Sequence, residues 1–457
     1  MKSTFTTLEN FGHSLSAPSY RFLPTTSDEI YEAFQLAKKT GVTVTLRGAG
    51  RSYNDASLNG GGIVLDMTGM NQIVEWDASS GVVRCEAGVT LEQLWHKVLP
   101  DGWWPPVVSG TMYTTLGGCL GANIHGKNNF RKGTIGEHVI EFDAILPTGA
   151  EITCSPKRNA DLFYAIISGL GMLGVITRVT LQMIKIESGL IEVHAWPTRT
   201  IEEQIRGLED GAPEYNYIVG WLDTMSIGHG QIHAANYVTD DPDPAKLQVS
   251  YQTLPDRFFG VMPKNLLHYF MKPFVNDIGW RGINTAKYIA SLRRHSFRQS
   301  HAAFHFLLDY VPDWELSAGR GGLIQYQSFL PKETALQTWT EILAITKRRG
   351  LLSYLGVTKR HRPDKFLLSH ALDGFSLALD FKVTDRNRAR LSEMLQEFDQ
   401  MVLDAGGRFY FAKNSETSAE TARAFLGEKT IERFKKLKKR TDPNGLLESD
   451  LYRRIFG

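Results

Sequence analysis

The sequence predicts an α+β protein of two domains, in which the second domain is inserted into the first. Helical and alternating strand patterns are mixed through the first hundred residues. Between about residues 197 and 407 the glycine clusters thin out and aromatic residues become more frequent. Because 457 residues are enough for two or three domains with buried cores, we expect a first domain of residues 1–195, completed by residues 408–457, and a second domain of residues 196–407.

The first helix is predicted from the residues at its ends and from its apolar spacing. Thr26 is the expected N-cap, Glu29 follows three residues later as in a capping box, and Gly41 supplies the stop. Between them, apolar residues recur at helical spacing. The same patterns predict strands over 42–46, 63–65, 82–83, 139–146 and 175–181, and helices over 90–99, 161–168, 418–426 and 430–440.

Charge and composition exclude several classes of protein. The 51 Lys and Arg residues nearly balance the 49 Asp and Glu residues, which argues against a nucleic-acid-binding protein. Three widely spaced cysteines indicate small core residues, with no disulfide framework and no metal site: Cys85, Cys119 and Cys154. We see no secretory signal and no apolar run long enough to span a membrane, so we expect a cytoplasmic protein. The basic run over 435–440 is interpreted as a solvated helical face.

Residues 169–174 match G-x-G-x-x-G, the fingerprint of dinucleotide-binding Rossmann folds. That interpretation needs a strand before the motif and a helix after it. Here a helical pattern comes first and an alternating strand follows, so we interpret the segment as a helix-to-strand turn with glycines at the helix C-cap. The signatures of common hydrolases, zinc proteases and P-loop enzymes are absent from the sequence.

Two glycine-rich stretches predict a nucleotide cofactor. The turn over 47–53 places Gly48 and Gly50 beside Arg47 and Arg51, so its backbone N–H groups can approach a pyrophosphate closely. The second stretch, over 110–128, is rich in small residues that permit the approach of a large planar or anionic ligand.

Together these stretches resemble the FAD domain of the vanillyl-alcohol oxidase superfamily, whose FAD-binding domain is of the PCMH type with two subdomains. Within that superfamily the chain resembles the decaprenylphosphoryl-β-D-ribose 2′-oxidases, through motifs from both halves of the chain: 47–53, 110–118, 124–128, 323–327, 357–359, 379–381 and 407–415. The resemblance covers nearly the whole chain and implies an inserted substrate domain with an antiparallel sheet flanked by helices. It also implies that FAD is held non-covalently, because Arg51 stands where many members carry a flavin-linking histidine. Ala378 stands where some relatives carry a pocket cysteine, which affects the pocket lining more than the chemistry.

The resemblance implies the following site residues. FAD would contact Arg47, Gly48, Ala49, Gly50, Arg51, Ser52, Tyr53, Gly110, Thr115, Leu116, Gly117, Gly118, Ala122, Asn123, Ile124, His125, Ile176, Tyr410 and Lys413. The substrate would face Gln325, Gln327, Lys359 and Ser376, and the catalytic residues would be Lys413, His125, Lys359, Gln327 and Tyr53.

Flavin oxidation of a secondary alcohol needs removal of a hydroxyl proton and stabilisation of the reduced flavin anion, and a buried lysine can serve both needs. Lys413 is the first choice. Lys359 lies next to Arg360, His361 and Arg362, a cluster that fits either a solvated loop or a phosphate-binding site.

Other residues keep two interpretations. Gln325 and Gln327 share one face of a strand, which suits a sugar or a solvent-facing surface. Tyr53 is a gate over the flavin or a packing residue, and His125 is a base, a hydrogen-bonding group or a structural residue. Residues 263–280 mix apolar, aromatic and basic side chains, which fits core better than a membrane surface that receives a lipid tail.

The expected reaction is oxidation of the 2′-hydroxyl of a polyprenylphosphoryl ribose to the keto sugar, after which a short-chain reductase would complete the epimerisation to arabinose. The substrate is therefore a small or lipid-linked sugar, and a peripheral contact with the inner face of the membrane is compatible with it. Two alternatives remain: an oxidase of free alditols or aldonolactones, and a flavin-dependent reductase of a lipid double bond.

Overall fold

The amino-terminal sheet mixes parallel and antiparallel pairing and is covered by one helix. The computed structural model describes residues 2–226, 228–254, 257–258, 262–293 and 295–457. Its first elements are β1 (Lys2–Glu9), β2 (Ser16–Leu23), α1 (Ser27–Thr40), β3 (Val44–Arg47) and β4 (Ile63–Asp66). The strand order is β1-β2-β4-β3, with β1 antiparallel to β2 and β4 parallel to both β2 and β3.

Helix α1 has the predicted caps. The Thr26 side chain accepts a hydrogen bond from the Glu29 N–H, and Gly41 adopts the left-handed conformation at φ 72°. The Glu29 carboxylate accepts from the N–H of Thr25 at 2.6 Å, so the returning bond of the expected capping box goes to the residue before the N-cap.

The second sheet is antiparallel throughout, in the order β5-β6-β10-β8-β9. Its strands are β5 (Ile73–Asp77), β6 (Val82–Glu86), β8 (Val139–Ile145), β9 (Glu151–Cys154) and β10 (Val175–Gln182). The associated helices are α2 (Leu91–Val98), α3 (Leu116–Gly121), α4 (Asn129–Lys132) and α5 (Ala160–Ile166), and β7 (Trp103–Trp104) pairs with β11 (Ile184–Lys185). Cys85, Cys119 and Cys154 are free and buried, as expected for core residues.

The G-x-G-x-x-G segment connects α5 to β10, so the helix precedes it and the strand follows, as predicted. Two of its residues, Leu170 and Gly171, have a positive φ, and so does the preceding Ser168. The expected glycine C-cap is wrong in detail, because the C-cap of α5 is Ile167 in an extended conformation.

The third sheet has eight strands in the order β17-β12-β14-β13-β19-β20-β18-β21, and its pairings are antiparallel. The strands are β12 (Leu190–Thr198), β13 (Tyr217–Leu222), β14 (Gly230–Tyr237), β17 (His295–Ser300), β18 (Leu323–Pro331), β19 (Leu355–His361), β20 (Gly374–Lys382) and β21 (Arg408–Phe409). The fold is therefore α+β with a large antiparallel sheet, as expected. This sheet reaches a few residues beyond 196–407 at both ends, and the division into two domains at those limits stays a prediction.

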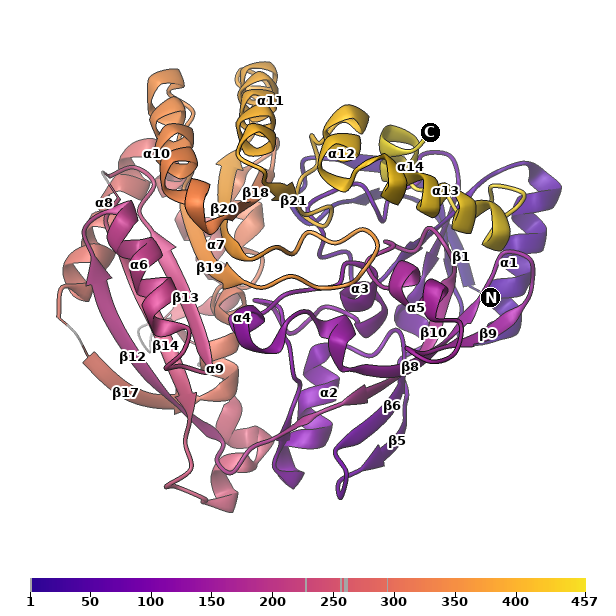
Figure 1. The fold of residues 1–457 in the computed structure, drawn as a ribbon, viewed down its shortest axis with the longest axis horizontal. Helices are drawn as coiled ribbons and strands as arrows, with labels where there is room; N and C mark the ends of the chain where they lie inside the picture. Colours follow the sequence, from indigo (N-terminus) through magenta and orange to yellow (C-terminus); the bar gives the residue numbers. More distant parts are fainter. Residues whose placement is uncertain (1, 227, 255–256, 259–261, 294) are drawn as a thin grey trace.

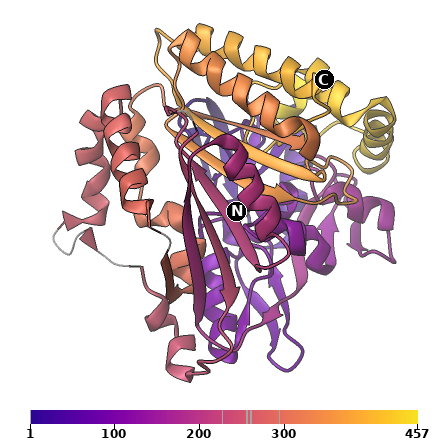
Figure 2. The same cartoon turned by 60° about the vertical axis from the view of Figure 1, so that its left-hand side comes forward.

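Helices cover one face of the large sheet. They are α6 (Ile201–Gly211), α10 (Lys332–Arg349) and α11 (Arg388–Asp404), and Figure 2 shows α10 and α11, in orange and gold, lying over the strands. Tyr326 of β18 packs on Phe398 of α11, and Phe375 of β20 packs on Trp339 of α10. Because side chains alternate along a strand, Gln325, Gln327 and Ser376 point to the opposite face.

Smaller elements lie beside this sheet. They are β15 (Arg257–Phe258), β16 (Met262–Pro263), α7 (Lys264–Met271), the 3-10 helix η6 (Lys272–Phe274), α8 (Asp277–Ser291) and α9 (His301–His305). The expectation that 263–280 is core is wrong for most of its large apolar side chains, because Phe270 and Phe274 are 56% and 58% exposed and Ile278 is 84% exposed. In the part of the chain that the structure describes, no helix combines the length and the apolar character needed to cross a membrane.

The last helices return to the amino-terminal half of the molecule, where Figure 1 shows them in yellow beside the indigo strands. They are α12 (Ala419–Leu426), α13 (Glu428–Thr441) and α14 (Asp450–Ile455). The Val44 N–H donates to the Leu446 carbonyl at 2.7 Å, which joins this segment to β3. The solvated-face interpretation of 435–440 is wrong at Lys438, which is buried and forms a 2.7 Å ion pair with the buried Asp442.

Candidate active site

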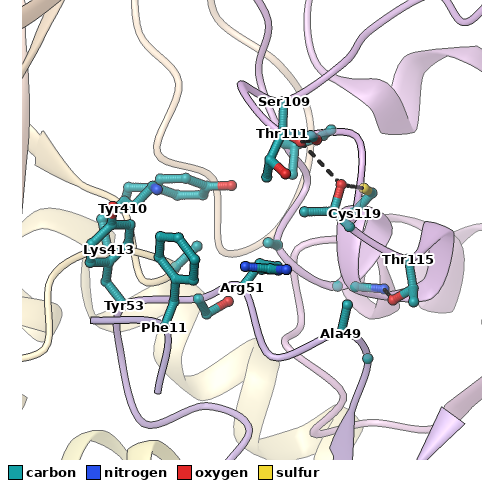
Figure 3. A pocket seen from close by; sticks show the side chains of 18 of the residues that line it. Phe11, Ala49, Arg51, Tyr53, Ser109, Thr111, Thr115, Cys119, Tyr410 and Lys413 are labelled. Carbon is teal, nitrogen blue, oxygen red and sulfur yellow. Dashed lines mark hydrogen bonds between the residues drawn. The ribbon is translucent and has the colours of Figure 1, made fainter. Parts of the chain in front are cut away.

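A cavity of about 320 Å³ lies between the two glycine-rich stretches and the face of the large sheet opposite α6, α10 and α11. All but two of the predicted site residues line it, and the exceptions are Leu116 and Asn123. Figure 3 shows Tyr410, Lys413 and Tyr53 on one side of this cavity and Thr115 and Cys119 on the other, with Arg51 between them. Residues far apart in the sequence therefore form one site.

Glycine is required where the two glycine-rich stretches touch. A Cβ on Gly48 would lie 2.1 Å from Oγ1 of Thr115, and a Cβ on Gly117 would lie 2.9 Å from Cβ of Ala87. Gly50 adopts φ +67°, which favours glycine. The backbone on this side of the cavity is thus free of side chains that would keep a ligand away.

Leu116 and Asn123 have structural positions. Leu116 is the fully buried first residue of α3, whose N-cap is Thr115. The Asn123 side chain accepts from the Gly136 N–H at 3.1 Å and donates to the Asp364 carboxylate at 3.1 Å. Both residues hold the second stretch in shape without lining the cavity.

The two arginines of the first turn differ in their contacts. Arg47 donates to the Glu9 carbonyl at 2.8 Å and to the Ser57 hydroxyl at 3.3 Å. The Arg51 guanidinium lies 5.3 Å from the Phe11 ring centroid and 3.8 Å from the Glu315 carboxylate. Its Nε is buried and has no hydrogen-bond partner among the described residues, so this group is available to a ligand.

Polar side chains of the large sheet form the opposite wall. Gln325 donates to the Asp380 carboxylate at 2.5 Å, and the Gln327 amide lies 3.3 Å from both the Ser376 hydroxyl and Nε2 of His125. Nε2 of His361 lies 2.7 Å from the same hydroxyl. The solvent-face alternative for the two glutamines is therefore wrong, because both are buried and face the cavity.

Two lysines enter the cavity near each other. Burial, together with the charge of Lys413, lowers the pKa of Lys359 to about 7. Burial lowers the pKa of Lys413 to about 8, against an upward effect of the Asp380 carboxylate. Near neutral pH a substantial fraction of each amine is therefore neutral and can accept a proton, whereas an exposed lysine is almost fully protonated.

The two arginines that follow Lys359 are paired with carboxylates. Arg360 is buried and forms ion pairs with Glu209 and Asp373, each at 2.6 Å. Arg362 pairs with Glu137 at 2.8 Å. Of this cluster, only Lys359 lines the cavity.

His125 stands beside these lysines. It is 7% exposed, and Nζ of Lys359 lies 3.4 Å from its Nδ1. Burial first, and then the charge of Lys359, holds the pKa of the imidazole well below its usual range, so the ring is neutral. The Tyr410 ring centroid is 5.3 Å away. His125 therefore belongs to the site, and its neutral ring can donate one hydrogen bond and accept another.

Tyr53 is held rigidly at the edge of the cavity. Its N–H donates to the Ala412 carbonyl at 3.0 Å, and Nζ of Lys413 lies 4.3 Å from its ring centroid. The ring is 1% exposed and packs edge-on against Phe11 at 5.1 Å. These contacts favour the interpretation of Tyr53 as a packing residue over that of a gate. Its hydroxyl lacks a hydrogen-bond partner in the described parts of the chain.

Several cavity residues were missed by the sequence analysis. Leu355 and Val357 precede Lys359 on β19 at alternate positions, and period-two alternation from Lys359 would have found them. Lys127 and His305 also line the cavity. Lys127 donates to the carbonyls of Phe304 and His305, a contact with residue 305 that no local pattern indicates.

The site fits a dinucleotide better than a metal ion. The Gly48–Thr115 contact leaves room only for backbone on one side, and Arg51 presents an unpartnered buried nitrogen there. No group of three or more His, Cys, Asp or Glu side chains in the described ranges is arranged to hold a metal ion. A nucleotide can bind the backbone turns while its reactive ring faces the lysines.

Comparison with known proteins defines the class. Residues 18–155 match the family model described as an FAD binding domain. The chain is 32% identical over 468 aligned positions to decaprenylphosphoryl-β-D-ribose oxidase of Mycolicibacterium smegmatis, and this alignment covers 98% of each protein. It is 22% identical to L-gulonolactone oxidase of Mus musculus over 96% of each, and 36% identical to cytokinin dehydrogenase 10 of Oryza sativa subsp. japonica over 38% of this chain and 34% of that protein.

The protein is therefore an FAD-binding oxidoreductase of the vanillyl-alcohol oxidase superfamily. Within that class, the chain belongs to the family of decaprenylphosphoryl-β-D-ribose oxidase.

Proposed function

We propose that the protein oxidises the 2′-hydroxyl of a polyprenylphosphoryl-β-D-ribose to the 2′-keto sugar, with FAD bound non-covalently. The observation that carries the proposal is the cavity wall formed by Gln325, Gln327, Lys359 and Lys413. Two amides and two amines with lowered pKa values suit a ligand that presents several hydroxyl groups and must lose a proton. The full-length similarity to decaprenylphosphoryl-β-D-ribose oxidase supports the choice of sugar.

The chain's own residues divide the work. When bound, FAD accepts a hydride from the carbon that carries the hydroxyl. Lys359, neutral above pH about 7, is the group that accepts the hydroxyl proton. Lys413, charged below pH about 8, places a positive charge in the cavity where negative charge develops. His125 orients the Lys359 amine at 3.4 Å, and Gln327 and Ser376 hold the sugar hydroxyls.

The first turn supports the non-covalent part of the proposal, because Arg51 offers no nucleophile there for a bond to the flavin. Precipitating the holoprotein with acid tests this part. The yellow colour should pass into the supernatant, whereas a coloured pellet would mean a covalent bond from another cavity residue, such as His125 or Cys119.

The substrate is tested by anaerobic bleaching of the flavin with a panel of sugars. A polyprenylphosphoryl ribose should bleach it, and Lys359→Met and Lys413→Met should slow bleaching by about 10²-fold or more without loss of FAD. Bleaching by free aldonolactones alone would instead support the activity named for the similar L-gulonolactone oxidase. Bleaching by NADPH would support a reductase of a lipid double bond.

A 2′-keto sugar is a substrate for a carbonyl reductase, so we propose that a short-chain reductase acts next and yields the arabinose donor used in cell-wall synthesis. The three reduced, buried cysteines suit a cytoplasmic setting at the inner face of the membrane. Coupled turnover with that reductase, read as NAD(P)H consumption after the flavin step, tests the order of the two reactions.

A further inference from the structure

Helices α7 and α8, with η6 between them, carry a dense run of exposed apolar side chains. Six of them are more than half exposed, between 52% and 84%: Tyr269, Phe270, Phe274, Ile278, Ile289 and Leu292. Figure 2 shows this helical segment, in rose, projecting at the left beside the large sheet. Large clusters of exposed apolar side chains on a protein surface mark interaction sites.

The contacts of α8 show which of its faces is free. Its inner face carries Trp280, stacked on Tyr354 with centroids 5.7 Å apart, and Asn284, which donates to Asp223 at 2.9 Å. Nζ of Lys287 on the same side lies 4.2 Å from the Trp221 ring. The opposite face holds exposed residues at a spacing of three or four: Ile278, Arg281, Thr285, Ile289 and Leu292. Trp280, Asn284 and Lys287 attach α8 to the protein, so the apolar residues on its opposite face are turned to solvent.

The charged residues of this segment are mostly basic. Residues 264–293 contain five Lys or Arg residues and a single acidic residue, Asp277. The Asp277 carboxylate accepts a hydrogen bond from the Tyr354 hydroxyl at 3.2 Å. Lys272, Arg281 and Arg293 are exposed among the apolar side chains. A basic, apolar and aromatic surface is complementary to an anionic lipid bilayer and repels a second copy of itself.

The surface also adjoins a segment that lines the cavity. Nζ of Lys264 at the start of α7 lies 5.2 Å from the Tyr310 ring centroid. Tyr310 ends the 3-10 helix η7 (Leu307–Tyr310), in which Leu307 and Leu308 line the cavity. A bilayer beneath α7 and α8 would therefore lie close to the segment that borders the site.

We propose that the exposed face of α7, η6 and α8 docks the protein on an anionic lipid bilayer. Docking lets the lipid tail of the substrate stay in the bilayer while the sugar enters the cavity, a consequence that rests on the function proposed above. Aromatic side chains enter the interface, and the basic residues contact lipid phosphates.

Cosedimentation of the FAD-loaded protein with lipid vesicles tests the proposal. The holoprotein should bind vesicles of mixed phosphatidylglycerol and phosphatidylcholine and should bind pure phosphatidylcholine vesicles less. Phe270→Ser/Phe274→Ser should weaken binding by at least about tenfold. The matched control is Phe5→Ser on β1, which removes an aromatic ring that is 66% exposed elsewhere and should leave binding unchanged. FAD content and flavin bleaching should be the same in all three proteins.

Three results would overturn the proposal. They are no vesicle binding by the unaltered protein, equal binding by the double variant, or an equal loss in the Phe5→Ser control. Light scattering that shows a dimer broken by Phe270→Ser/Phe274→Ser would assign the surface to a second copy of the chain instead. No sugar is present in the vesicle assay, so it can succeed or fail independently of the bleaching experiment that tests the substrate.

Discussion

The contact between Gly48 and Thr115 predicts that Gly48→Ala weakens FAD binding. A Cβ on Gly48 would lie 2.1 Å from Oγ1 of Thr115 and 3.3 Å from its Cβ, so the two turns must move apart. Such overpacking costs about 1–3 kcal/mol. If that cost falls on the cofactor-bound conformation, the dissociation constant of FAD rises roughly 5- to 150-fold, at about 1.4 kcal/mol per tenfold.

Removing the Thr115 hydroxyl tests whether the steric clash causes the weaker FAD binding. Thr115→Ala deletes the atom at 2.1 Å but also the weak cap to the Gly118 N–H at 3.4 Å, so alone it weakens binding slightly. The double variant should bind FAD more tightly than Gly48→Ala alone. The assay is quenching of FAD fluorescence on titration with apoprotein, and Gly60→Ala, whose Cβ would be 3.8 Å from the nearest atom, is the control. Losses that simply add in the double variant would refute the steric argument.

Three more predictions concern protons and a buried ion pair. Flavin reduction by sugar should rise with pH up to about 7, because Lys359 must lose its proton, and Lys359→Met should abolish that limb in anaerobic stopped-flow profiles. The Asp380 carboxylate raises the pKa of Lys413, so Asp380→Asn should move the alkaline limb near pH 8 to lower pH, whereas the exposed Asp373→Asn should leave it in place. Lys438→Ala leaves Asp442 buried without its cation and should lower the free energy of unfolding by about 3–5 kcal/mol in urea titrations, against less than about 0.5 kcal/mol for the exposed Lys439→Ala.

The fold was predictable where local chemistry decides it. Thr26 and Gly41 end α1 through their own side-chain and backbone preferences, and the order of helix and strand around residues 169–174 excluded a Rossmann turn. The basic run shows the limit. Lys438 and Lys439 are adjacent in the same basic run, yet Lys438 meets Asp442 and the Leu447 carbonyl, which the turn after α13 brings back, while Lys439 is exposed.

The site was predictable as a set of residues but not as a network. The glycine-rich stretches and Lys413 line the cavity as expected. The partners of Arg360 come from α6 and from the segment before β20, so its removal from the cavity depends on pairings that no local pattern encodes. The prediction that the residues of α7 are core failed for a similar reason. Periodicity shows that a helix has an apolar face but does not show whether another element covers that face.

The hydrogen bond from the Tyr53 N–H to the Ala412 carbonyl has a consequence for biosynthesis. Tyr53 is synthesised long before Ala412, so a nascent chain carries an open half-site until Ala412 has left the ribosome. Non-local contacts of this span close late in folding. Cofactor capture therefore requires the segment around Ala412, and a truncation that removes the segment from Gly407 onward should yield a protein that stays colourless.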